Sequence, residues 1–256
     1  MFRTNRLKRD LRSGKPCTGA WLFCGSPVVG EILGGQGFDA LIIDQEHSPQ
    51  GVETTIETLR AIECAGQTTV LVRIGNSRAD TLKVVLDSGA EGIVVPNVES
   101  AEEARELIMG CRFPPAGRRG AHFTVSRAAR WGTSGTQYLA HHEEELLVVA
   151  MIESARGLAA AADILAVDGI DMLFVGPLDL TASFNCMGDY ADSRIVAAIE
   201  EIPTIAAKLG KWAGCTVLGN LTARRLNEVG YGFVTVGSDV TFLQQAAGTV
   251  RRQDRG

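Results

Sequence analysis

The sequence predicts a single (β/α)8 barrel, and three features of the chain indicate it. Short apolar segments alternate eight times with amphipathic segments along the 256 residues. Several apolar segments, such as residues 41–43 and 92–95, are uninterrupted, as parallel strands covered on both faces usually are. No linker or change of composition divides the chain, and its length suits one barrel. Residues 1–256 are therefore expected to form one domain.

The expected strands are runs of β-branched or apolar residues bounded by Gly, Asn or Asp. Their bounds follow from the positions of those polar and turn-forming residues. In chain order the strands are residues 18–23, 40–44, 69–73, 92–96, 147–153, 172–175, 214–217 and 233–236.

The expected helices follow most of the strands. Residues 52–65 carry apolar side chains at helical spacing and end at Gly66, a residue that often terminates helices. A second clear pattern covers residues 78–88. A further helix begins at Ser100, three residues before a glutamate, which is the spacing of a capping box. An Ala-rich helix is expected at residues 157–166.

One long segment, residues 112–145, interrupts the alternation between the fourth helix and the fifth strand. It contains a Pro-Pro pair and several glycines, and a short helix near residues 136–144 is expected to close it. Segments of this length are usually lids, binding loops or interface arms. Its start is expected on the face opposite the active site, because it leaves the end of a helix.

The composition excludes several classes of function. The net charge is −5 and the basic residues are scattered, so a nucleic-acid partner is not expected. No apolar run reaches the roughly 18 residues of a transmembrane helix, and the N-terminus does not resemble a signal peptide. The six cysteines form no CxxC pair, which is typical of reduced thiols. We therefore expect a cytoplasmic protein that binds no membrane.

Polar residues gather where the predicted strands end. Barrel enzymes build their active sites at the C-terminal ends of the strands. The opposite ends carry mostly Gly, Ala, Asp and Thr in turn-like contexts. This asymmetry predicts the position of the active site. The C-terminal ends carry Asp44, Gln45, Glu46, His47, Arg73, Asn97, Glu153, Ser154, Asp179, Ser238 and Asp239.

Glu153 and Asp179 follow two adjacent strands, the fifth and the sixth. Two converging carboxylates without a nearby lysine can hold a hard divalent cation through oxygen. The same carboxylates can instead pair with arginine or backbone N–H groups, or act as an acid and a base without metal. The spacing alone leaves these interpretations open.

Asp44 and His47 lie three residues apart after the second strand. If the aspartate accepts the imidazole N–H, His47 can act as a general base. The alternative is a histidine that only caps the next helix. Arg73 ends a buried strand and needs an anionic or carbonyl partner. That partner is either the substrate or a structural residue such as Asp44 or Glu153.

The positions of the lysines argue against Schiff-base chemistry. An enzyme that forms a Schiff base with a carbonyl substrate needs a lysine at the barrel mouth. None of the five lysines ends a predicted strand, so a Lewis-acid metal is the expected electron sink. The lysines are Lys8, Lys15, Lys83, Lys208 and Lys211.

Seven stretches from the second strand to the eighth carry a resemblance to a known family. They are residues 37–47 (GFDALIIDQEH), 72–74 (VRI), 86–90 (LDSGA), 112–120 (RFPPAGRRG), 152–154 (IES), 174–180 (FVGPLDL) and 236–239 (VGSD). In this order they resemble the HpcH/HpaI aldolase family, the metal-dependent class II pyruvate aldolases that include 2-dehydro-3-deoxyglucarate aldolase. The resemblance covers nearly the whole chain and implies a phosphoenolpyruvate/pyruvate-domain-like barrel.

The resemblance implies a catalytic role for several of the candidate residues. Glu153 and Asp179 would be the protein ligands of a Mg²⁺, Mn²⁺ or Co²⁺ ion. His47, oriented by Asp44, would be the base. Arg73 would polarise the keto oxygen of the substrate and stabilise the pyruvate enolate.

The resemblance also implies a substrate-binding set. The backbone N–H groups of Leu178 and Asp179 would meet the substrate carboxylate, and Trp21 matches a pocket aromatic. Three positions depart from the family: Gln45 replaces a frequent Gly, Met151 a frequent Gln and Thr216 a frequent Leu. These departures leave the metal and base residues intact but put the substrate in question. The set is Trp21, Arg73, Gly176, Leu178, Asp179 and Thr216.

Asp87 lies on the helix predicted at residues 78–88, away from the barrel mouth of its own subunit. In the family a residue at this place reaches the active site of the neighbouring subunit. The resemblance therefore implies a homo-oligomer, and the usual form is a hexamer built as a trimer of dimers. The alternative is an exposed helical aspartate without a catalytic role.

The expected activity is retro-aldol cleavage of a 2-keto-3-deoxy-4-hydroxy acid to pyruvate and an aldehyde. A CoA-ester lyase of the citramalyl or malyl type, or an oxaloacetate decarboxylase, could use the same residues. A CoA lyase would want a basic patch near the mouth, and the sequence has no clear one. A non-catalytic binding barrel is a third alternative, which the complete set of catalytic residues argues against.

Overall fold

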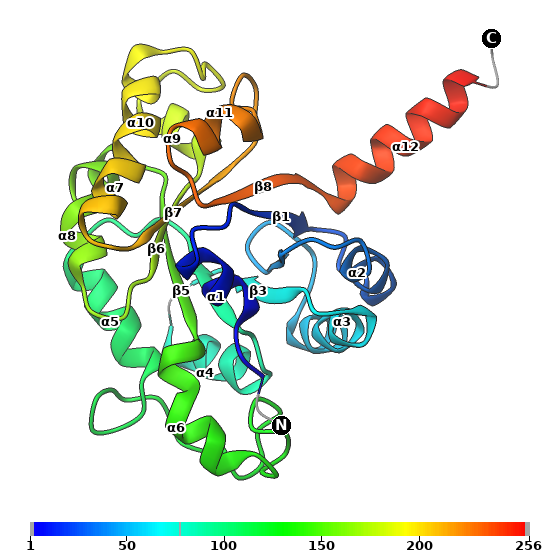
Figure 1. Ribbon diagram of the computed structural model, residues 1–256, viewed down its shortest axis with the longest axis vertical. Helices are drawn as coiled ribbons and strands as arrows, with labels where there is room; N and C mark the ends of the chain where they lie inside the picture. Colours follow the sequence, from blue (N-terminus) through cyan, green and yellow to red (C-terminus); the bar gives the residue numbers. More distant parts are fainter. Residues whose placement is uncertain (1–2, 77, 254–256) are drawn as a thin grey trace.

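The computed structural model describes residues 3–76 and 78–253, and it confirms the predicted barrel. Eight parallel strands close in sequence order, with β1 paired to β8 (Figure 1). Three strands have the predicted bounds, and the other five differ from them by one or two residues. The strands are β1 (Cys17–Leu22), β2 (Ala40–Asp44), β3 (Thr69–Arg73), β4 (Gly92–Val95), β5 (Leu147–Ile152), β6 (Met172–Val175), β7 (Trp212–Thr216) and β8 (Phe233–Ser238).

Helices lie around the strands, as the alternating pattern predicts. The expected helix at residues 157–166 is instead two short helices that meet at Ala160. None of the described helices is long and apolar enough to cross a membrane. The helices are α1 (Arg6–Arg12), α2 (Pro27–Gly34), α3 (Val52–Ala65), α4 (Ala79–Asp87), α5 (Ala101–Cys111), α6 (Gly135–Glu145), α7 (Ala155–Ala159), α8 (Ala161–Ala166), α9 (Pro177–Ser183), α10 (Ser193–Lys208), α11 (Ala223–Glu228) and α12 (Asp239–Gln253).

The interior of the barrel is filled by large side chains that face glycines. A Cβ atom at Gly214 would come within 2.5 Å of the Phe174 ring, and one at Gly19 within 2.7 Å of the Phe233 ring. The two rings lie 6.1 Å apart between their centroids. The barrel is therefore closed by packed side chains below its mouth, as is usual for this fold.

The segment at residues 112–145 has structure of its own. Its first part is a series of turns, and α6 takes its last eleven residues. The buried guanidinium of Arg119 lies 4.6 Å from the centre of the Phe113 ring and donates to the hydroxyl of Tyr138 at 2.8 Å. These contacts fix the segment against the neighbouring α4, because Arg119 also bonds to Asp87 at 2.7 Å.

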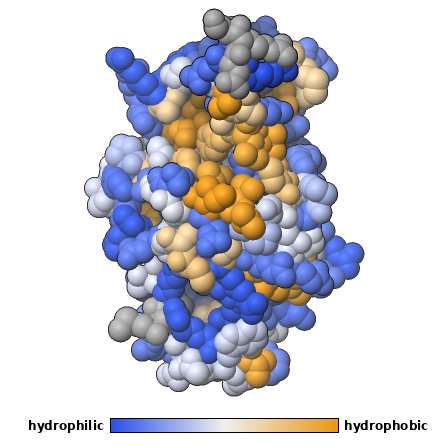
Figure 2. Space-filling view, turned by 90° about the vertical axis from the view of Figure 1, so that its right-hand side faces the viewer, coloured by the Kyte–Doolittle hydropathy of each residue, from blue (hydrophilic) through white to orange (hydrophobic). Residues whose placement is uncertain are grey.

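The last helix, α12, departs from the barrel pattern. It projects away from the strands (Figure 1), and of its fifteen residues only Asp239 is buried. The Asp239 carboxylate fixes its start by accepting the backbone N–H groups of Phe23 and Cys24, each at 2.9 Å. Apolar side chains gather on the face that contains α12 and α2 (Figure 2). They include Val28, Ile32, Leu243 and Val250, each more than half exposed.

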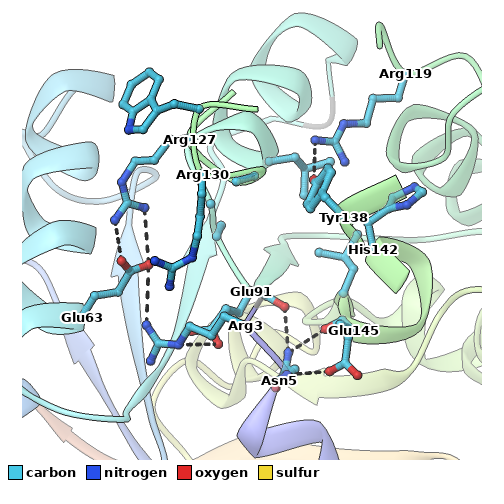
Figure 3. Close-up of a pocket in the computed structure, with 16 residues that line it drawn as sticks. Arg3, Asn5, Glu63, Glu91, Arg119, Arg127, Arg130, Tyr138, His142 and Glu145 are labelled. Carbon is cyan, nitrogen blue, oxygen red and sulfur yellow. Dashed lines mark hydrogen bonds and ion pairs between the residues drawn. The ribbon is translucent and has the colours of Figure 1, made fainter. Parts of the chain in front are cut away.

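A cavity of about 220 Å³ lies beside the N-terminal ends of β4 and β5, away from the predicted active site. Arginine–glutamate pairs line it (Figure 3): Glu63 lies between Arg127 and Arg3, and Arg3 reaches Glu91 at 3.2 Å. Burial raises the pKa of Glu91 to about 7, although Arg3 and the backbone N–H of Val70 lower it. The Glu91 carboxyl therefore titrates near neutral pH while it is buried in the folded protein.

Replacement of Glu91 by Gln tests this burial. The pKa of the folded state, about 7, lies above the ordinary value of 4.5, so the folded protein holds the proton more tightly. The wild-type protein should lose unfolding free energy relative to Glu91→Gln between pH 5 and pH 8, by up to about 3 kcal/mol. Urea unfolding of both proteins at each pH measures the difference. A difference that is the same at both pH values would contradict the assigned pKa.

Candidate active site

The C-terminal ends of the strands bring the predicted polar residues to one end of the barrel. Ion pairs and electrostatic interactions connect four of them: Asp44 pairs with Arg73, and Glu153 is influenced by the charges of Arg73 and Asp179. The register explains the first pair, because Asp44 on β2 lies directly beside Arg73 on β3. The predicted location of the site is therefore consistent with the geometry.

Arg73 is the buried cation at the centre of this group. Its Nε donates to Asp44 at 2.6 Å, and one terminal nitrogen lies 3.0 Å from the Glu46 carboxylate. Its guanidinium also lies 4.6 Å from the centre of the Trp21 ring. The structural pairing with Asp44, left open by the sequence, is present. Glu46 is a second partner that the sequence did not single out.

Asp44 does not orient the His47 imidazole as the sequence suggested. Its two carboxylate oxygens accept the backbone N–H groups of Glu46, at 3.1 Å, and of His47, at 2.9 Å, besides the Arg73 Nε. The His47 ring is largely exposed, and its Nε2 lies 3.7 Å from the Glu46 carboxylate. The correction has a simple cause: a carboxylate that ends a strand caps the following turn through backbone N–H groups.

Gln50 also belongs to the turn after β2, and the sequence analysis did not identify it as a site residue. Its side-chain amide donates to the carbonyl of Asp44 at 2.5 Å and of Leu22 at 3.3 Å. The hydroxyl of Ser48 donates to the same Asp44 carbonyl. These bonds hold the turn that carries His47 against the end of β1. A polar residue six positions after the strand was the only available signal.

Trp21 lies on the inner side of β1, where its indole is almost completely buried. Its Nε1 donates to the hydroxyls of Thr216, at 3.1 Å, and Thr235, at 3.0 Å. The two hydroxyls lie 2.8 Å apart. Thr216, one of the three predicted departures from the family, therefore belongs to a polar cluster with Trp21. Thr235 was not predicted as part of the site.

Glu153 is held at the end of β5 with one side open to the mouth. One carboxylate oxygen accepts the backbone N–H of Asn97 at 2.6 Å. The other lies where a Cβ atom at Gly176 would come within 2.6 Å, so only glycine permits this approach. Burial, with smaller contributions from the charges of Glu46 and Asp179, raises the pKa of Glu153 to about 7, although the backbone N–H of Asn97 and the charge of Arg73 lower it. Burial and the neighbouring carboxylates therefore outweigh the positive charge of Arg73.

Asp179 and Leu178 lie in the first turn of α9, next to Glu153. Both side chains are exposed. The backbone N–H groups at the start of a helix have no partner within it, so those of Leu178 and Asp179 are available to an anion. Among the described residues no three His, Cys, Asp or Glu side chains form a complete metal cage. A cation here would have two carboxylate ligands and would need water or substrate for the rest.

Asp87 ends α4, and the structure places it apart from this group, against Arg119. Its side chain is 26% exposed, which is enough to meet a second molecule. Arg119 fixes its carboxylate, and the catalytic role of Asp87 stays a prediction.

Known proteins similar to this chain include aldolases. A hydroxypyruvate/pyruvate aldolase of Delftia acidovorans is 36% identical over 243 residues, which are 95% of this chain and 90% of that protein. A 4-hydroxy-2-oxo-heptane-1,7-dioate aldolase of Shigella sonnei is also 36% identical, over 95% of this chain and 92% of that protein. The crystal structure of a family protein from Burkholderia cenocepacia J2315 superposes with a TM-score of 0.94 and 33% identity, covering 99% of this chain and all of that one.

The names of these relatives confirm the predicted enzyme class, a carbon–carbon lyase. The family model for HpcH/HpaI aldolase/citrate lyase matches residues 18–246, which include all eight strands except the first residue of β1. With a closed barrel, the expected residues at its mouth and this match over nearly its whole length, the chain belongs to the HpcH/HpaI aldolase/citrate lyase family.

Proposed function

We propose that the protein is a divalent-metal-dependent aldolase that cleaves a 2-keto-3-deoxy-4-hydroxy acid to pyruvate and an aldehyde. The observation that carries this proposal is that two carboxylates, Glu153 and Asp179, lie close enough to influence each other's charge and that the buried guanidinium of Arg73 also acts on Glu153. The name of one relative, a hydroxypyruvate/pyruvate aldolase, adds a second candidate substrate: an acid that keeps a hydroxyl at C3 and would give hydroxypyruvate. Aldol chemistry is reversible, so the same site would also join these compounds.

Glu153 and Asp179 would hold a Mg²⁺, Mn²⁺ or Co²⁺ ion. The raised pKa of Glu153 and the space that Gly176 leaves beside its free oxygen fit a bound cation, because a cation would remove the repulsion among the carboxylates. When bound, such an ion acts as a Lewis acid toward the keto and carboxylate oxygens of the substrate. The remaining tasks fall to side chains and backbone groups of the protein.

The substrate would be oriented by two groups. Its carboxylate would accept the backbone N–H groups of Leu178 and Asp179 at the start of α9. Its keto oxygen would face Arg73, whose position the Asp44 carboxylate and the Trp21 ring determine. An arginine held in this way stabilises negative charge that develops on the oxygen in the transition state.

The bond-breaking step begins with the proton of the C4 hydroxyl. His47 would take this proton through a water molecule while the C3–C4 bond breaks and a C=O bond forms at C4. The electron pair of the broken bond becomes the enolate of pyruvate, whose oxygen faces Arg73. The Glu46 carboxylate, 3.7 Å from the His47 ring, would stabilise the imidazolium. A proton added at C3 completes pyruvate, and the aldehyde leaves.

The first test is pyruvate release from a panel of 2-keto-3-deoxy sugar acids, coupled to lactate dehydrogenase. Release should stop with EDTA and return with Mn²⁺ or Mg²⁺. Glu153→Gln should lower kcat/KM at least about 100-fold and weaken Mn²⁺ binding in calorimetry, because it removes one ligand charge. The control Glu102→Gln changes an exposed carboxylate on α5 and should have no effect.

Two outcomes would count against the aldolase. Release that persists after exhaustive EDTA treatment would exclude the metal. No release from any acid, in a protein that still binds Mn²⁺, would favour the CoA-ester lyase or the decarboxylase on the same residues.

We further propose a homo-oligomer, with the hexamer as its form, in which Asp87 serves the active site of a neighbouring subunit. Two features support this proposal. The projecting α12 and the neighbouring α2 expose Leu243, Val250, Val28 and Ile32, which a second subunit would bury. Asp87 is held by Arg119 with its carboxylate still partly exposed, although it is apart from its own barrel mouth.

Complementation tests the shared site. His47→Ala and Asp87→Asn should each be inactive alone, whereas co-expressed oligomers should recover about a quarter of the activity, because random pairing restores that share of sites. The two variants carry different tags, so mixed oligomers can be purified through both. Oligomers of His47→Ala with itself are the control. Mixed oligomers without recovered activity would mean that Asp87 acts in its own subunit or has no catalytic role.

A further inference from the structure

The hydroxyl pair at the barrel mouth, Thr216 and Thr235, has an asymmetry that bears on the substrate. Thr235 lies within β8 and is fully buried, whereas Thr216 ends β7 and is partly exposed. Both hydroxyl oxygens accept the single Nε1 proton of Trp21, which holds them on the inner wall of the barrel. The Trp21 ring in turn contacts the guanidinium of Arg73.

The protons of the two hydroxyls can be assigned by accounting for their acceptors. One hydroxyl donates to the other across 2.8 Å, and the second proton needs a different acceptor. Among the described residues the Thr235 hydroxyl has no acceptor except Thr216. If Thr216 donated, the Thr235 proton would be buried without a partner, which is unfavourable. Thr235 is therefore the donor, and the proton of Thr216 remains free.

Because Thr216 ends β7 and is partly exposed, its free proton is accessible from the mouth. Its oxygen already accepts from Trp21 and Thr235, so the hydroxyl cannot rotate without losing one of these bonds. Thr216 thus places an oriented hydrogen-bond donor in the wall of the barrel.

We propose that Thr216 donates this hydrogen bond to a hydroxyl oxygen of the substrate, so that the enzyme favours a hydroxylated substrate over its deoxy analogue. The proposal rests on the aldolase function above and specifies its substrate. The hydroxyl can belong to the keto acid, as in hydroxypyruvate, or to the aldehyde. The chemistry recognised is the same, and the experiment separates the two sources.

The experiment measures aldol synthesis with two matched pairs of substrates. Hydroxypyruvate is compared with pyruvate at a fixed aldehyde, and glycolaldehyde with acetaldehyde at a fixed keto acid. The wild type should prefer the hydroxylated member of one pair. Thr216→Val, which keeps the shape of the side chain, should lower kcat/KM for that member about tenfold and for its partner less than about twofold. The pair that responds identifies the source of the hydroxyl.

Three further variants distinguish recognition from a structural role. Thr216→Ser keeps the donor and should restore the preference. Thr216→Leu should behave as Thr216→Val does or lose more. Thr58→Val removes a buried hydroxyl from α3, where it bonds to the carbonyl of Thr54, and should leave the preference unchanged.

Each outcome bears on one of the two proposals. An active wild type in which Thr216→Val lowers activity equally with all four substrates would overturn this inference alone, since Thr216 would then act by holding Trp21. A preference for the deoxy members would also overturn it. A wild type that joins no keto acid to any aldehyde would contradict the aldolase function itself.

Discussion

The arrangement of the active site depends on the ion pair between the buried guanidinium of Arg73 and the carboxylate of Asp44. A cation inside a barrel of apolar strands must be compensated, because an unpaired buried charge is strongly destabilising. The parallel register of β2 and β3 supplies the compensation by placing Asp44 beside it. Asp44 then also accepts the backbone N–H groups of the next turn, so one carboxylate fixes both the arginine and the start of the loop that carries His47.

Besides the ion pair of Asp44 with Arg73, the mouth contains three further carboxylates. Glu46, Glu153 and Asp179 approach the same region, and the pKa of Glu153 rises because it is buried and because the other two repel its charge. Such an arrangement costs stability unless a cation or a proton occupies the site. None of the five lysines ends a strand, and in the proposed mechanism a metal ion would supply the compensating charge.

Sequence patterns predicted the barrel well because a strand covered on both faces is recognisable from its own residues. The positions of Asp44, Arg73, Glu153 and Asp179 followed from the same patterns, since the first two end strands and the other two follow strands closely. The partner of each side chain did not follow. The three-residue spacing of Asp44 and His47 is compatible with a bond to the ring or to the backbone, and the fold uses the backbone. The cluster of Trp21, Thr216 and Thr235 joins three strands that are far apart in sequence.

The helices around the barrel show a similar division between local and distant constraints. The fifteen residues after Ser238 form the helix α12, which leaves the barrel and exposes Leu243 and Val250, so these two apolar side chains are not packed within one chain. Arg119 provides the complementary case: it is buried between two aromatic rings and holds Asp87 at a fixed place where a neighbouring subunit can meet it. In the proposed oligomer, a rigid acid at the surface and an unpacked apolar helix would both gain a function. Residues of the barrel mouth would then complete their site with a group from a second chain, and the stability of the assembly and the activity of the enzyme would depend on the same contacts.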